Sequence, residues 1–311
     1  MATSSPKSKF GSGVLALVVL AAIYGLTAVM SRYFSLQTSL FEQWYLRFGI
    51  ASLLTALVFY RKIEYKKFLH ASSHELNLMV LRGVIGLILA AGLYALASQQ
   101  EKIGIVSLMQ ILPLTAVFGM LIMHEKLTRQ RALLLTMSLI GAIIVLTPKL
   151  SAGFGFSSGA IWSLISGALF ALTFVLRKKQ TGELNNYELT LGTLVVGAIG
   201  NYVLSLIMYH RAFVDVTQWS PTLGLLFLGA GLLSALMGLL SSYGFEHVPA
   251  ITASVILDLE LVFGIIFGFL IYREVLSGYE IVGASIILAA IVIMSYAENK
   301  KRAYIVPAPI D

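Results

Sequence analysis

Long apolar runs follow one another along most of the chain, with short polar connections between them. An apolar helix of about 20 residues spans the hydrocarbon core of a bilayer at a rise of 1.5 Å per residue. Ten such runs can be marked, with approximate limits at 13–33, 40–60, 76–97, 103–123, 130–148, 158–176, 187–209, 222–244, 249–272 and 278–297. The pattern predicts an all-α integral membrane protein with ten transmembrane helices.

The two halves of the chain repeat short stretches of sequence in the same order. Glu125-Lys126-Leu127-Thr128 has a counterpart in Glu274-Val275-Leu276-Ser277, 149 positions later, and 24–30 has one in 170–176, at an offset of 146. If each copy has an odd number of spans, the second copy enters the bilayer in the opposite orientation to the first, as in many secondary transporters. We therefore expect two inverted five-helix repeats at 13–148 and 158–298. A loop at 149–157 joins them, and 1–12 and 299–311 are expected to be loose tails.

Composition supports a membrane protein and removes several kinds of chemistry. Of 311 residues, 58% are hydrophobic and only 12% are charged, which is too few to cover a water-soluble globule. The chain has no cysteine, so disulfides and thiolate sites are excluded. The first apolar run is longer than a signal-peptide core and lacks a small-x-small cleavage pattern, so we expect a retained span.

Basic residues indicate how the chain is oriented. The net charge is +7, but the Lys and Arg residues are dispersed in short loops without interleaved aromatics, which argues against nucleic acid as a partner. With the N terminus in the cytoplasm, fifteen of them fall on the cytoplasmic side and five outside. The bias predicts a multi-pass protein of the cytoplasmic membrane with both termini in the cytoplasm.

Four ionisable residues stand out well inside predicted spans, where such residues usually face protein or a water-filled cavity. Asp258 and Glu260 lie near the middle of the ninth span. Two positions on a helix are about 200° apart, so we expect one carboxylate to line a central path and the other to contact a neighbouring helix or an arginine. Arg47 and Arg82 are the natural counter-charges, although each lies near enough to a span end to snorkel to the interface.

Other polar and aromatic residues extend this candidate substrate site. Aligning Leu261 with Pro113, an offset of 148, makes Gln110 the counterpart of Asp258 and Leu112 that of Glu260. Polar groups at matching depths of inverted helices are where substrate sites form. Further cavity candidates, each of which also suits packing or an interfacial belt, are Tyr24, Trp44, Tyr94, Phe170, Asn201 and Tyr243. Pro113 should bend its helix, either as a hinge or as a packing kink.

The junctions between spans carry helix-start signals. Ser277 and Glu280 fit a capping box, and Thr128 stands at the matching point of the first half. Glu125 and Glu274, just before these caps, are expected either to gate or pair with ions or, alternatively, to cap and pack a tight turn.

Catalytic motifs are missing. The chain lacks a phosphate-binding Gly-rich loop, a Gly-x-Ser-x-Gly elbow and a His-Glu-x-x-His pair. His70 and His74 share a spacing that suits one helix face but have no third ligand nearby. We expect no enzyme activity, no cofactor and no metal site.

Taken together, these motifs resemble the drug/metabolite transporter superfamily and, within it, the EamA-type ten-helix transporters. The resemblance rests on Tyr24-Gly25, on Trp44-Tyr45-Leu46-Arg47-Phe48, on the run from Pro113 to Thr128, and on the run from Leu259 to Glu274. It implies a five-plus-five inverted bundle around a central cavity that exports or exchanges small organic solutes, often amino acids. The family's second-half motif usually reads Glu-Pro-Val. Leu261 replaces that proline here, so the ninth helix lacks the residue that would kink it.

The predicted function is a secondary transporter that moves a small organic metabolite through the bilayer by alternating access. Carboxylates in the ninth span favour an amino acid or a related zwitterion or cation, or proton coupling through Asp258, because an anion would be repelled there. A channel-like pore and a non-transporting scaffold or receptor remain alternatives. The sequence leaves both a monomer and a homodimer open.

Overall fold

The computed structural model describes residues 6–34, 38–100, 106, 109–110, 112–150, 157–210, 213–214, 219–273 and 277–305. Within these ranges all regular secondary structure is helical, as the sequence predicts. The elements are α1 (Pro6–Phe34), α2 (Leu40–Val58), α3 (Lys67–His70), α4 (Ser73–Arg82), η1 (Gly83–Ala90), α5 (Ala91–Gln100), α7 (Leu114–Met123), α8 (Arg129–Leu150), α9 (Ser158–Leu176), η2 (Arg177–Lys179), α10 (Asn186–Tyr209), α11 (Pro221–His247), α12 (Ala250–Leu257), α13 (Leu259–Tyr272) and α14 (Gly278–Ile305).

Eight helical segments in the described part are long and apolar enough to cross a membrane. They are Lys9–Thr27, Ser73–Ala97, Arg129–Thr147, Ser158–Lys179, Asn186–Tyr209, Pro221–His247, Ala250–Ile271 and Gly278–Glu298. The 19-residue α2 carries the buried charges Glu42 and Arg47, and the ten-residue α7 is apolar. The chain is therefore a multi-pass membrane protein.

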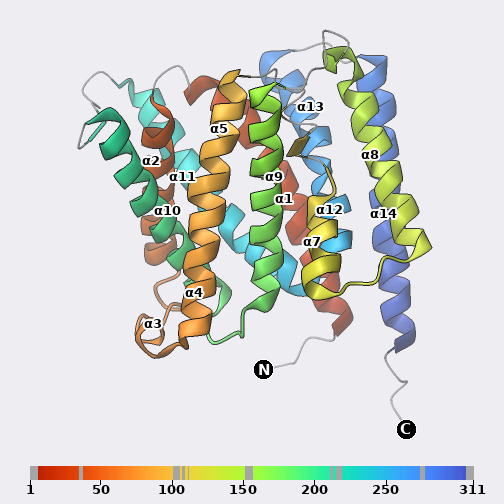
Figure 1. Cartoon of the computed structure of the whole chain (residues 1–311), viewed down its shortest axis with the longest axis horizontal. Helices are drawn as coiled ribbons and strands as arrows, with labels where there is room; N and C mark the ends of the chain where they lie inside the picture. Colours follow the sequence, from red (N-terminus) through yellow and green to blue (C-terminus); the bar gives the residue numbers. More distant parts are fainter. Residues whose placement is uncertain are drawn as a thin grey trace.

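The helices lie side by side in one bundle, and α1 begins at the same edge of the bundle at which α14 ends (Figure 1). The connections at 59–72, 124–128, 177–185 and 246–249 are drawn together at this edge. The Asn185 side chain donates to the Lys62 carbonyl over 2.9 Å, and the Ala250 amide donates to Glu125 over 2.8 Å. We call this edge the basic end, because its connections, together with the ends of α1, α8 and α14 beside them, carry most of the described Lys and Arg residues.

Small residues bring the helices into close contact, as expected for membrane bundles. A Cβ atom added at Gly25 of α1 would lie 2.7 Å from the Gly264 backbone nitrogen of α13, and one added at Gly141 of α8 would lie 2.9 Å from the Gly283 carbonyl of α14. The largest cluster of buried apolar residues lies where α1, α8, α11, α12, α13 and α14 meet.

Among the described residues, three of the ten predicted spans are not continuous α-helices. The third changes from α4 to the π-helical η1 and back to α5. Pro113 precedes α7 with a ψ angle of 46°, so helical geometry is interrupted at the proline. The ninth segment is divided at Asp258 into α12 and α13, although no proline occupies the motif. The interruption of the ninth helix therefore does not depend on that proline.

The sequence predicts loose tails at 1–12 and 299–311, but both segments are partly helical. α1 begins at Pro6 rather than after residue 12, and α14 continues to Ile305 rather than ending at 298. In both cases the polar residues extend an apolar helix beyond the expected limit.

Candidate functional site

A cavity of about 230 Å³ lies inside the bundle and is lined by helices from both halves of the chain. Eight of the residues singled out from sequence line it: Tyr24, Trp44, Arg82, Tyr94, Gln110, Phe170, Asp258 and Glu260. The walls also include Phe48, Leu87 and Phe174, so aromatic and aliphatic surface surrounds a few ionisable groups. This combination is typical of small-molecule sites.

The two carboxylates of the ninth segment face the same cavity. Asp258 stands at the break between α12 and α13, and Glu260 lies in the first turn of α13. The sequence predicted that only one of them would line the central path, whereas both do, and the helix that carries them is interrupted rather than continuous. Asp258 also accepts a hydrogen bond from the Ser138 hydroxyl of α8, which holds its carboxylate against the wall.

Arg82 lines the cavity from the end of α4 and is only 5% exposed. Its Nε donates to the Thr173 carbonyl over 3.3 Å and its Nη1 to the Gln180 Oε1 over 2.8 Å. The expected ion pair with Asp258 or Glu260 is not found among the described residues. Gln180 belongs to the 177–185 connection, so the guanidinium reaches toward the basic end, as the snorkelling alternative predicts, while the residue lines the cavity.

Arg47 is buried more deeply, at 1% exposed, and lies outside the cavity lining. Its Cζ is 4.7 Å from the centroid of the Trp44 ring and 6.0 Å from that of Phe34. It is neither a partner of Asp258 nor a snorkelling residue. The guanidinium instead contacts the rings of Trp44 and Phe34, and Trp44 also forms part of the cavity wall.

Asn201 and Tyr243 also lie outside the cavity lining, contrary to expectation. Asn201 Nδ2 donates to the carbonyls of Leu87 and Gly197 over 2.8 and 2.7 Å. The Tyr243 hydroxyl lies 2.7 Å from that of Ser12, toward the basic end. Both side chains join neighbouring helices.

Gln110 reaches the cavity from the first half. Its Nε2 donates to the Ser163 carbonyl of α9 over 3.0 Å. Sequence reasoning missed a set of hydroxyl residues in the lining, namely Thr27, Thr115, Thr173, Thr193, Ser234, Ser241, Ser242 and Ser254. The spacing of Ser234, Ser241 and Ser242 at i, i+7 and i+8 places them on one helix face and could have revealed them.

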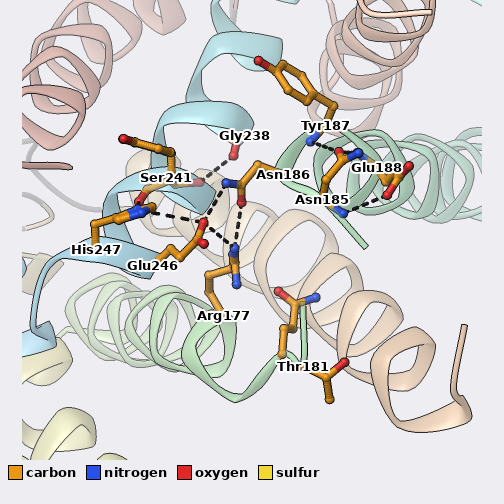
Figure 2. A network of polar contacts seen from close by, with 12 residues as sticks. Arg177, Thr181, Asn185, Asn186, Tyr187, Glu188, Gly238, Ser241, Glu246 and His247 are labelled. Carbon is orange, nitrogen blue, oxygen red and sulfur yellow. Dashed lines mark hydrogen bonds and ion pairs between the residues drawn. The ribbon is translucent and has the colours of Figure 1, made fainter. Parts of the chain in front are cut away.

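Polar contacts gather at the basic end (Figure 2). Arg177 Nη2 donates to Asn186 Oδ1 over 2.7 Å and to Glu246 Oε2 over 3.0 Å, and Asn186 Nδ2 donates to the same Glu246 oxygen over 2.7 Å. The Thr181 amide donates to Glu75 of α4 over 2.8 Å. These contacts tie the start of α10 to the end of α11 and the connection after α9 to α4.

Glu125 both caps a helix and forms an ion pair. It accepts hydrogen bonds from the Ala250 and Ile251 amides, over 2.8 and 3.1 Å, at the start of α12. Lys178 Nζ lies 3.5 Å from the same carboxylate. Its sequence counterpart Glu274 lies outside the described residues.

The predicted caps of the two related helices are confirmed. Ser277 and Glu280 form the reciprocal capping box, with the Glu280 amide donating to the Ser277 hydroxyl over 3.2 Å and the Ser277 amide donating to the Glu280 carboxylate over 2.9 Å. The Thr128 hydroxyl accepts from the Arg131 amide over 3.3 Å.

The sequence matches the EamA-like transporter family over residues 11–147 and again over 157–296. The chain belongs to this family. The two matches correspond to the two halves inferred from the internal sequence repeat, and the resemblance to drug/metabolite transporters of the EamA type is confirmed.

Individual EamA relatives agree with this assignment. The chain is 27% identical to an S-adenosylmethionine uptake transporter of Rickettsia prowazekii over 279 residues, which cover 88% of each chain. It is 26% identical to an uncharacterized transporter of Archaeoglobus fulgidus over 207 residues, covering 64% of this chain and 70% of the relative. A solved crystal structure with 13% sequence identity superposes with a TM-score of 0.74, covering 92% of this chain and 99% of the other, and so shares the fold.

Proposed function

We propose that this EamA protein is a secondary transporter for an amino acid or a related zwitterion or cation, acting by efflux or exchange through alternating access. The observation that carries the proposal is the cavity inside the bundle, where Asp258 and Glu260 face the interior without an ion-pair partner among the described residues. Carboxylates in such a position are expensive to bury and usually mark a substrate or proton path.

The proposed architecture is a ten-helix bundle of two inverted five-helix repeats. Two separate family matches support it, as does the direction of the first helix of each half. α1 begins at the basic end, whereas α9 ends there, next to Arg177 (Figure 1). The interruptions at Pro113 and Asp258 fall close to corresponding positions of the two repeats.

The orientation we propose places the basic end and both termini in the cytoplasm. The excess of Lys and Arg at that end supports it. In the same scheme, the contacts of Arg177, Glu246, Lys178 and Glu125 close the cytoplasmic side and must open for alternating access.

The substrate class draws support from the Rickettsia prowazekii relative. S-adenosylmethionine carries a sulfonium cation and an amino-acid group. Carboxylates and the aromatic faces of Tyr24 and Phe170 around one cavity suit a cation of this kind. S-adenosylmethionine is therefore the first ligand to test, followed by amino acids, nucleobases and organic cations.

The test is flux in proteoliposomes containing the purified protein. A carrier is expected to show saturable uptake and acceleration by substrate trapped inside the vesicles. Flux that rises linearly with concentration and shows no exchange would identify a pore. Ligands that shift the melting temperature of the protein but do not cross the membrane would identify a receptor.

A further inference from the structure

Opposite charges enter the cavity from two separate groups of helices. Asp258 stands between α12 and α13 and Glu260 lies on α13, and these two helices pack chiefly on α1, α7, α8 and α14. Arg82 belongs to α4, which packs with η1 on α9 and α10. No ion pair joins Arg82 to either carboxylate among the described residues, so the cavity has an acidic wall at Asp258 and Glu260 and a separate basic wall at Arg82.

The Arg82 guanidinium is fixed in place but keeps bonding capacity. Its two bonds go to neutral acceptors, the Thr173 carbonyl and the Gln180 side chain, and they occupy two of its five N–H donors. Glu75, about two turns earlier on α4, already accepts from the Thr181 amide and hydroxyl. A buried cation without a direct carboxylate partner is costly unless an anion binds it. The remaining donors therefore suit an anionic group that enters the cavity.

We propose that Arg82 binds the carboxylate of the transported molecule while Asp258 and Glu260 bind its cationic centre. The inference rests on the proposed transport function and narrows its substrate class. Since no ion pair joins the two walls, the ligand must bridge them. It is therefore a zwitterion whose carboxylate and distal cation are separated by several bonds, as in lysine or S-adenosylmethionine.

The orientation of such a ligand follows from the geometry of each wall. A guanidinium can hold a carboxylate through two parallel N–H donors, which fixes one end of the ligand. At the other end, Tyr24 lies beside the carboxylates in the lining and offers an aromatic face to a cation. Removing the carboxylate of the ligand should therefore weaken its binding to the basic wall, and removing its cationic group should weaken its binding to the acidic wall.

Ligand pairs that differ only in the carboxylate provide the first test. Binding of S-adenosylmethionine and of its decarboxylated form, and of lysine and cadaverine, would be measured by calorimetry on the purified full-length protein. We expect the wild-type protein to bind the carboxylated member of each pair at least about tenfold more tightly, because charge-assisted bidentate hydrogen bonds are strong. This comparison needs no variant and so does not depend on how a variant folds.

Variants then assign the preference to one residue. Arg82→Gln should bind both members of a pair with the same affinity, and Arg82→Lys should keep part of the preference. Arg47→Gln is the matched control, since Arg47 is a buried arginine outside the cavity lining, and it should keep the full preference. Asp258→Asn should weaken both members equally, because both retain the cation.

Equal binding of both members by the wild-type protein, or an undiminished preference in Arg82→Gln, would overturn the assignment of Arg82. Absence of binding by all four probes would overturn the proposed zwitterion class. With either of these outcomes, saturable flux of another metabolite would still show that the protein is a transporter.

Discussion

The Glu125 carboxylate, in the first half of the chain, lies 3.5 Å from the Lys178 ammonium group in the second half. The same carboxylate accepts two backbone amides at the start of α12. One side chain thus joins three connections at the basic end. An anion at a helix N-terminus is favourable because it pairs with amides that lack a partner within the helix.

Removing this carboxylate should loosen the basic end. We expect Glu125→Ala to lose about 1 kcal/mol of helix-capping energy and to raise the accessibility of the cavity from that side. Because the chain has no cysteine, Ser241→Cys in the cavity wall offers a single labelling site. A membrane-impermeant maleimide applied to the basic end should modify it several-fold faster in the Glu125→Ala background. Lys126→Ala, at the exposed neighbouring position, is the control, and equal rates in all three backgrounds would contradict a closing role.

Asp258→Asn should abolish transport or its dependence on pH without loss of folded protein. The substitution keeps the size of the side chain but removes the ionisable group from the acidic wall, so a decrease of about tenfold or more in flux is expected. Ser138→Ala serves as the comparison, because it removes the hydrogen bond to Asp258 and leaves the carboxylate in place. Flux measured from pH 5 to 8 that is identical for wild type and Asp258→Asn would count against the assignment.

Gly25 should tolerate no side chain. An added Cβ would lie 2.7 Å from the Gly264 nitrogen and 2.9 Å from the Glu260 carbonyl, both of which are backbone atoms that cannot move aside cheaply. We expect Gly25→Ala to cost about 1–3 kcal/mol through overpacking and to lower the melting temperature in detergent. Gly229→Ala, where the added atom meets open space, should not lower it. A melting temperature for Gly25→Ala at or above that of the control would show that α1 and α13 can separate freely.

The connection after η2 should weaken in acid. The Ser72 amide and hydroxyl donate to Glu183 over 2.6 and 2.7 Å, and these bonds hold the pKa of that carboxyl below its ordinary value of 4.5. Folding therefore favours the ionised form. The stabilising contribution is present above pH 4.5 and is lost as the pH falls through the lower folded pKa.

The measurement is the difference in melting temperature between wild type and Glu183→Gln as a function of pH. Wild type should be the more stable near pH 7, by a small amount because the residue lies at the surface. The difference should shrink below about pH 4.5. A difference that grows in acid would show that the hydrogen bonds do not favour the carboxylate.

The sequence predicted the helical membrane fold because each apolar run carries its own signal. It also predicted local caps such as Ser277 and Glu280, whose pattern needs no tertiary contact. The position of Asp258 and Glu260 within the ninth span was identified as well. That both line the cavity was not, because the break between α12 and α13 carries no proline or glycine in the sequence.

Residues whose side chains join two helices were harder to predict from the sequence. Asn201 and Tyr243 are polar groups inside the bundle, as a substrate site would require, but each forms a hydrogen bond with a residue that lies far away in sequence. Arg47 was expected either to be a counter-charge of the carboxylates or to snorkel to the interface, and instead contacts aromatic rings. The type of a residue and its depth within a predicted span can be read from one sequence, whereas the distant residue with which its side chain bonds cannot.

The π-helical stretch Gly83–Ala90 follows directly after Arg82. A π-turn is equivalent to one residue inserted into an α-helix, and each inserted residue rotates all that follows by about 100°. The direction of Arg82 around the helix axis therefore does not fix the direction of Tyr94, further along the same segment. A single insertion or deletion in this stretch would rotate the Arg82 side chain by about 100° relative to the rest of the segment.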